Sequence, residues 1–81
     1  KRFFVQGQVS RPGSFLLDQE MNLTQAISLA GGFTQWADKN NIVILRTMDG
    51  GQVRIKADYA RIVKGKDRNI AVHAGDTIII P

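Results

Sequence analysis

Residues able to carry out acid–base or nucleophilic chemistry are few in this chain, and they are not grouped. The seven acidic residues are scattered, and no two of them are spaced as a general acid and its base. The one histidine, His73, precedes Asp76 by three positions in a segment typical of a turn, and no activated nucleophile accompanies them. We therefore interpret His73 and Asp76 as turn residues, and we predict that the chain is not an enzyme.

Metal and phosphate sites also lack their usual residues. There is no cysteine, and a single histidine does not provide the ligand set of a transition-metal site. Gly31-Gly32 is not followed by the Lys-Ser or Lys-Thr of a phosphate-binding loop, so the pair indicates the end of a helix. We predict no metal and no cofactor. No apolar run approaches the length of a membrane span, so we expect no membrane insertion by this segment.

A small set of residues suits the binding of a sugar, namely Arg11, Gln35, Trp36, Arg46 and Arg54. Trp36 could stack on the apolar face of a pyranose while the amide of Gln35 bonds its hydroxyl groups. A tryptophan is often a core anchor instead, and this alternative stays open. Arg11, in an expected turn, is either a surface donor or an ordinary solvated residue.

The other two arginines are expected on paired strands. There, Arg46 and Arg54 could form a fork for carboxylate-bearing sugars, because guanidinium groups bind carboxylates through two parallel hydrogen bonds. Cross-strand solvation, or pairing with an acidic residue of the chain, is the alternative.

The net charge of +4 is concentrated in one segment, from Arg54 to Arg68. This basic strip contains two acids, Asp58 and Asp67, and six bases: Arg54, Lys56, Arg61, Lys64, Lys66 and Arg68. Such a strip can attract nucleic acid, anionic polysaccharide or lipid headgroups, or it can simply be a solvated face.

The 81 residues correspond to one domain, residues 1–81, with room for one small core. The only long amphipathic helix is predicted over Asn22–Ala30, because Leu23, Ala26, Ile27 and Ala30 share one face. Asn22 and Gln25 have the spacing of a capping box, and Gly31 suits the left-handed residue that ends a helix. The chain begins at Lys1 without methionine, so we expect it to be a piece of a longer protein.

Strand patterns surround this helix. Turn signals at Arg11–Ser14, read as a type II turn, and at Asp49-Gly50 indicate two hairpins. Asp58 can cap a short helical turn that ends at Val63. The expected strands are Phe3–Val9, Ser14–Leu17, Ile42–Leu45, Gln52–Lys56, Ile70–Val72 and Thr77–Ile80. The apolar runs of the third and last of them predict burial on both faces.

This order of elements predicts an α+β fold, a mixed sheet with one principal helix packed on one face. The first and last strands are the natural central pair and are expected to be parallel. That is the β-grasp arrangement.

Three segments carry a family resemblance that covers essentially the whole chain: Val5–Phe15, Leu23–Phe33 and Ala74–Pro81. They resemble the opening, the helix and the ending of a soluble-ligand-binding β-grasp (SLBB) domain. His73-Ala74 departs from the family pattern, which commonly has a polar residue and proline before Gly-Asp, and this loosens the turn.

The closest similarity is to SLBB domains of polysaccharide export proteins. It implies a non-catalytic binding and assembly module of capsule or exopolysaccharide export, in the periplasm or cell envelope, with a parent protein associated with the outer membrane. Its partners would be neighbouring domains or subunits and, weakly, polysaccharide.

SLBB domains also occur in DNA-uptake proteins, and nucleic-acid binding through Arg54–Arg68 is the alternative function. It ranks lower because only Tyr59 within that strip could stack a base.

Overall fold

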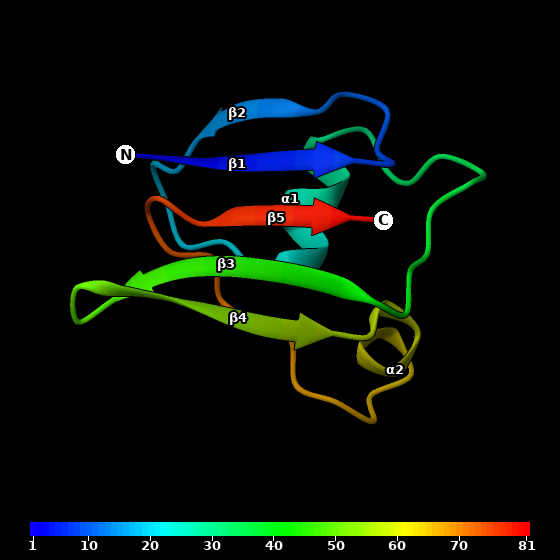
Figure 1. Ribbon diagram of the computed structural model, residues 1–81. Helices are drawn as coiled ribbons and strands as arrows, with labels where there is room; N and C mark the ends of the chain where they lie inside the picture. The colour runs from blue at the N-terminus through cyan, green and yellow to red at the C-terminus, as the bar shows by residue number, and fades with distance from the viewer.

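The computed structural model describes all residues, 1–81, as a five-stranded sheet with one main helix on one face (Figure 1). The elements along the chain are β1 (Arg2–Gly7), β2 (Gly13–Leu16), α1 (Leu23–Leu29), β3 (Ile42–Met48), β4 (Gly51–Ala57), α2 (Tyr59–Val63) and β5 (Thr77–Ile80). The strand order across the sheet is β2-β1-β5-β3-β4. β1 and β5 are parallel, and the other neighbouring pairs are antiparallel. The expected α+β, β-grasp-like arrangement is confirmed.

Helix α1 begins and ends as its sequence predicts. The side chain of Asn22 accepts from the Gln25 N–H at 3.0 Å, and Gln25 Oε1 accepts from the Asn22 N–H at 2.9 Å, which completes a capping box. At the other end Gly31 has φ +87°, and the Gly32 N–H donates back to the Ile27 carbonyl at 2.9 Å. These bonds satisfy backbone groups that a helix end leaves free.

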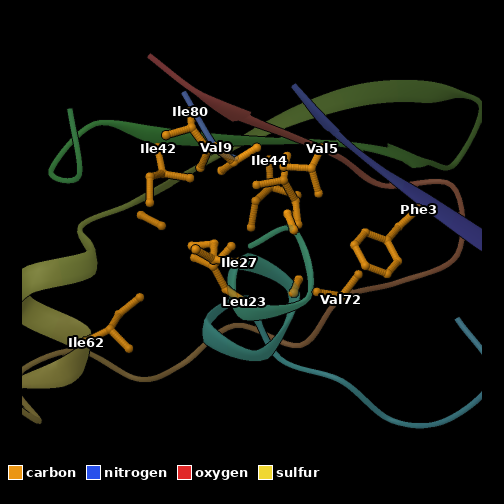
Figure 2. Packing of buried hydrophobic residues seen from close by; sticks show 14 residues of the cluster. Phe3, Val5, Val9, Leu23, Ile27, Ile42, Ile44, Ile62, Val72 and Ile80 are labelled. Atoms are coloured by element: carbon orange, nitrogen blue, oxygen red, sulfur yellow. The ribbon is translucent and has the colours of Figure 1, made fainter. Parts of the chain in front are cut away.

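The core lies between α1 and one face of the sheet (Figure 2). The helix contributes Leu23, Ala26, Ile27 and Ala30, all buried. Alternate residues of the central strands meet them, so the strands obey the period of two that a sheet imposes. These sheet residues are Phe3, Val5, Ile42, Ile44, Ile78 and Ile80.

The opposite face of the sheet, which we call the open face, has no helix over it. Leu45 and Ile79 lie there and are only half-buried, whereas Val43, which pairs with Ile79, is 8% exposed. The expectation of burial on both faces is therefore wrong for β5 and for Leu45 of β3, although Ile42, Val43 and Ile44 are all buried. Their apolar runs reflect one covered face and one apolar open face.

The connection from β1 to β2 is wider than the expected type II turn. Gly13 already belongs to β2, where it pairs with Val5, and its φ is +147°, whereas a type II turn needs about +80°. The loop lies against the end of α1. There the Ser10 N–H donates to the Gly32 carbonyl at 3.0 Å, and the Arg11 N–H donates to the Ala30 carbonyl at 2.8 Å. Free carbonyl groups at the helix end supply these acceptors.

Residues 70–72 do not form the expected strand. Ala71 makes one isolated bridge with Asn22, while the Ile70 carbonyl accepts from the Leu23 N–H at 2.8 Å. This segment pairs with the start of α1 because the first N–H groups of a helix need partners from outside it.

The second hairpin follows the prediction. Asp49 and Gly50 both have positive φ, 50° and 79°, as a two-residue type I′ turn requires. Met48 pairs with Gly51 directly beside this turn, and this pairing sets the register of β3 on β4. Asp58 caps α2 as expected.

Ile27→Ala should lower the free energy of unfolding by about 2–5 kcal/mol, because it leaves a cavity in the centre of the core. Leu29→Ala, on the same helix but 43% exposed, is the matched control and should cost less than about 1 kcal/mol. Urea unfolding measures both values. Equal losses would mean that the packing of α1 on the sheet does not organise the fold.

Candidate functional site

Two loops lie side by side at the end of the molecule where α1 and β1 end (Figure 1). We call Gln8–Arg11 and Gly32–Trp36 the paired-loop surface. Val9 forms an isolated bridge with Phe33. Thr34 donates to Gln8 twice, from its N–H to the Gln8 carbonyl at 3.1 Å and from its hydroxyl to Gln8 Oε1 at 2.8 Å. No sequence signal identified this role of Gln8 and Thr34, because their contact joins residues far apart in the chain.

Trp36 lies on this surface with 73% of its area exposed. Its side chain is therefore not a core anchor. Its backbone N–H donates to the Thr34 hydroxyl at 3.3 Å, and Gln35 beside it is also exposed. The loop thus presents an aromatic ring and an amide to solvent, as the sugar-binding hypothesis requires.

Arg11 comes from the other loop of the paired-loop surface. Its Nη2 donates to the Leu29 carbonyl at 3.3 Å, and the residue remains exposed. A positive charge at the carboxyl end of a helix is favourable because that end carries partial negative charge. Arg11 therefore helps to close α1 as well as adding a cation to the surface that carries Gln35 and Trp36.

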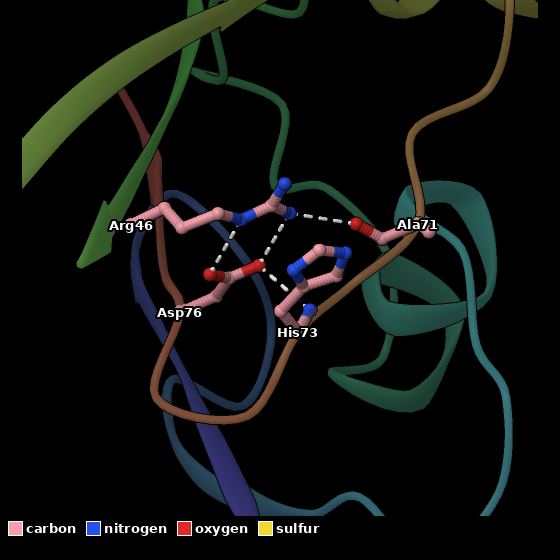
Figure 3. A network of polar contacts seen from close by, with 4 residues as sticks. All are labelled: Arg46, Ala71, His73 and Asp76. Atoms are coloured by element: carbon pink, nitrogen blue, oxygen red, sulfur yellow. Dashed lines mark hydrogen bonds and ion pairs between the residues drawn. The ribbon is translucent and has the colours of Figure 1, made fainter. Parts of the chain in front are cut away.

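Arg46 forms a bidentate ion pair with Asp76 (Figure 3). Its Nε donates to Asp76 Oδ1 at 3.0 Å, and its Nη2 donates to Asp76 Oδ2 and to the Ala71 carbonyl, both at 2.8 Å. Asp76, only 1% exposed, also accepts from the His73 backbone N–H at 2.8 Å. The interpretation of His73 and Asp76 as turn residues agrees with this bond, and pairing with an acid is the arrangement that Arg46 adopts.

The hydrogen bonds that Arg46 donates to Asp76 are the largest effect on the pKa of Arg46 and raise it above its ordinary value. Burial opposes them, and the charge of Asp76 adds a smaller upward effect. For a base with a raised pKa, the stabilisation is fully present below the pKa of the unfolded residue. It is lost only as pH rises through the higher folded value. The contribution of Arg46 to stability should therefore be constant through the neutral range.

Arg46 and Arg54 do not form a fork together, which was one of the two possibilities for these residues. Their strands pair, but Arg46 lies opposite Val53 and Arg54 lies opposite Leu45, so the two side chains are on opposite faces. Arg46 faces the helix side of the sheet, where it reaches Asp76, whereas Arg54 is exposed on the open face.

The basic strip is divided among several elements. Arg54 and Lys56 lie on β4, and Arg61 of α2 is paired with Asp67 at 3.0 Å. Tyr59, the one aromatic residue of the strip, packs edge-on against Phe33 with ring centroids 4.7 Å apart. Its ring is therefore already in contact with another side chain of the domain.

Two shallow grooves adjoin one another beside α1, and both are lined by Glu20, Met21 and Gln25. Neither includes any of the five candidate sugar-binding residues. Sequence reasoning did not indicate these grooves, because they arise where loops meet the helix. No cluster of three or more His, Cys, Asp or Glu residues is placed to hold a metal ion. None of the helices is long and apolar enough to cross a membrane.

A mixed sheet with a parallel central pair and one covering helix defines a β-grasp-like domain. Residues 2–56 match the family model described as SLBB domain. The chain belongs to this family, a class of ligand-binding modules. β5 follows the matched residues but lies between β1 and β3, so the sheet depends on it.

Proposed function

We propose that this domain is a non-catalytic binding and assembly module of a capsular or exopolysaccharide export protein. The parent protein would act in the periplasm and cell envelope and be associated with the outer membrane. Membership of the SLBB family supports a binding role. The resemblance of Val5–Phe15, Leu23–Phe33 and Ala74–Pro81 to SLBB domains, and among these to the domains of polysaccharide export proteins, supports the more specific role.

The exposure of Trp36 is the single observation that carries the glycan part of the proposal. An indole ring that is 73% exposed offers a large apolar face to a pyranose, and aromatic rings contribute contact area with little loss of conformational freedom. The bonds between Thr34 and Gln8 hold its loop in place. Arg11 and Gln35 add a cation and an amide to the same surface.

Affinity for glycan should be weak, with a Kd on the order of millimolar, because a channel must release its cargo. Contacts between domains or subunits would become strong only when repeated within an assembly, where effective concentration multiplies weak interactions.

Titration of the 15N-labelled domain with an anionic oligosaccharide should move the amide signals of Gln35 and Trp36 first. Trp36→Ala should abolish measurable binding and reduce polysaccharide export by the full-length parent protein, because it removes the stacking surface. Val63→Ala is the matched control, since Val63 is also an exposed apolar residue, at 57%. Shifts confined to Glu20 and Gln25 would place the ligand in the grooves beside α1 and contradict the assignment to Trp36.

Nucleic-acid binding is the alternative that the same titration tests. Duplex DNA should bind with a steep loss of affinity in salt, about 0.9 log unit per log unit of salt for each phosphate contacted, if the basic strip is its site. Two contacts weigh against this site. Arg61 of the strip is already paired with Asp67, and the ring of Tyr59 is already packed on Phe33. Sub-micromolar binding at physiological salt, mapped to Arg54–Arg68, would replace the export proposal.

A further inference from the structure

β4 is an outer strand of the sheet, and no strand lies beyond it (Figure 1). It runs for seven residues, Gly51–Ala57. The other outer strand, β2, has four residues. β4 is therefore the longer free edge that the domain offers to another polypeptide.

The register of the hairpin identifies the free backbone groups of this edge. Met48 and Gly51 flank a two-residue turn and form a hydrogen-bonded pair, and such pairs alternate along an antiparallel ladder. Gln52, Arg54 and Lys56 therefore direct their N–H and C=O groups away from β3. No turn, loop or cap hydrogen bond uses these groups. They repeat every second residue, the spacing that an added strand requires.

The side chains along the edge define the partner that would fit. Gln52, Arg54 and Lys56 are exposed on the open face, and β4 contains no acidic residue. On the helix side, Val53 is 38% exposed and Ile55 is half-buried. An added strand would thus place one set of alternate side chains beside two bases and the other set beside two β-branched apolar residues.

A second copy of β4 does not meet these requirements. Antiparallel pairing of two such edges would bring the bases of one strand close to those of the other, and like charges across a ladder repel. Basic residues on an edge strand are one of the means by which proteins prevent self-pairing. The charge pattern favours an acidic partner instead.

We propose that β4 is a docking edge for an extended segment of another polypeptide, in which acidic residues alternate with β-branched apolar residues. The segment adds a sixth strand to the sheet next to β4. Its main chain bonds Gln52, Arg54 and Lys56, its acidic side chains face the two bases, and its apolar side chains contact Val53 and Ile55. This inference rests on the proposed role of the domain as an assembly module and specifies one contact for it.

The probe for the test is the end-capped peptide Ser-Glu-Val-Glu-Val-Glu-Ser. At saturation it should slow amide hydrogen exchange at Gln52, Arg54 and Lys56 by at least about tenfold. Exchange at Val53 and Ile55, whose N–H groups already face β3, should change much less. A ligand that only covered the surface would not produce this alternation.

Charge reversal provides a second measurement. Arg54→Glu with Lys56→Glu should weaken peptide binding by at least about tenfold. A peptide with lysine in place of glutamate should restore it. Lys64→Glu with Lys66→Glu, which makes the same change of charge at residues outside β4, is the matched control. Restored binding also demonstrates that the double variant is folded.

Other outcomes would overturn the proposal. Peptide binding without alternating protection would place the contact elsewhere. Slowed exchange at these amides in concentrated protein alone would make a second copy the partner, and the same protection by polygalacturonate would make it a glycan. Because this test reads backbone exchange on β4, whereas the glycan test reads Trp36 and export, either proposal can fail without the other.

Discussion

Asp76→Asn should lower the free energy of unfolding by about 3 kcal/mol. The carboxylate of Asp76 is almost completely buried and accepts hydrogen bonds from Arg46 and from the backbone of His73. An amide would turn an N–H₂ group toward one of these donors and leave Arg46, whose side chain is 13% exposed, without its counter-charge. Breaking a buried pair by removing one partner is costly because the other charge remains desolvated. Urea unfolding at neutral pH measures the loss.

The exposed pair Arg61–Asp67 is the matched control for this measurement. Its N–O distance of 3.0 Å is similar, but the two side chains are 51% and 41% exposed. Asp67→Asn should therefore lower the free energy of unfolding much less than Asp76→Asn does, because solvent screens the pair. If the two substitutions cost the same, burial of Asp76 does not determine the strength of its pairing.

The fold could be predicted to a large extent because its signals are local. The cap at Asn22, the apolar spacing along α1 and the Asp49-Gly50 turn each depend only on residues that are close together in the sequence. The parallel pairing of β1 with β5 followed from the order of the elements. The shape of the Gln8–Pro12 loop could not be predicted, since it depends on the carbonyl groups of Ala30 and Gly32, which follow α1 about twenty residues further along the chain.

The candidate site was predicted less completely. Arg11 lies on one of two joined loops, and Gln35 and Trp36 lie on the other, but the contact between the loops depends on tertiary pairing of Gln8 with Thr34. No local pattern specifies that pairing, and residue composition alone did not decide whether Trp36 is buried.

The register of β3 on β4 explains why Arg46 and Arg54 lie on different faces of the sheet. Once Met48 pairs with Gly51, Arg46 must lie opposite Val53 and Arg54 opposite Leu45, on different faces. The Asp49-Gly50 turn signal alone would have predicted this pairing of β3 with β4, but the second glycine, Gly51, left another register possible. The partner of Arg46, Asp76, is thirty residues away.

Gly7 shows a requirement that the strand pattern does not reveal. It lies at the end of β1 with φ +95°, opposite Ile80 of β5. A Cβ atom at this position would overlap the Ile80 carbonyl oxygen and lie 2.9 Å from its carbon. Both are backbone atoms, so no side-chain rotation can relieve the contact. The same bend lets the Gln8 N–H reach the Ile80 carbonyl, at 2.9 Å, and leads the chain into the paired-loop surface.

Gly7→Ala should therefore lower the free energy of unfolding by at least about 3 kcal/mol, through left-handed strain and separation of β1 from β5. Gly32→Ala isolates the strain, because Gly32 has φ +83° but no atom within 4 Å of its added Cβ. It should cost about 1–2 kcal/mol. Urea unfolding gives both values, and hydrogen exchange should show faster opening at Gln8 in Gly7→Ala alone. Equal costs would mean that the approach of β1 to β5 can relax, and that only the conformation of Gly7 is required.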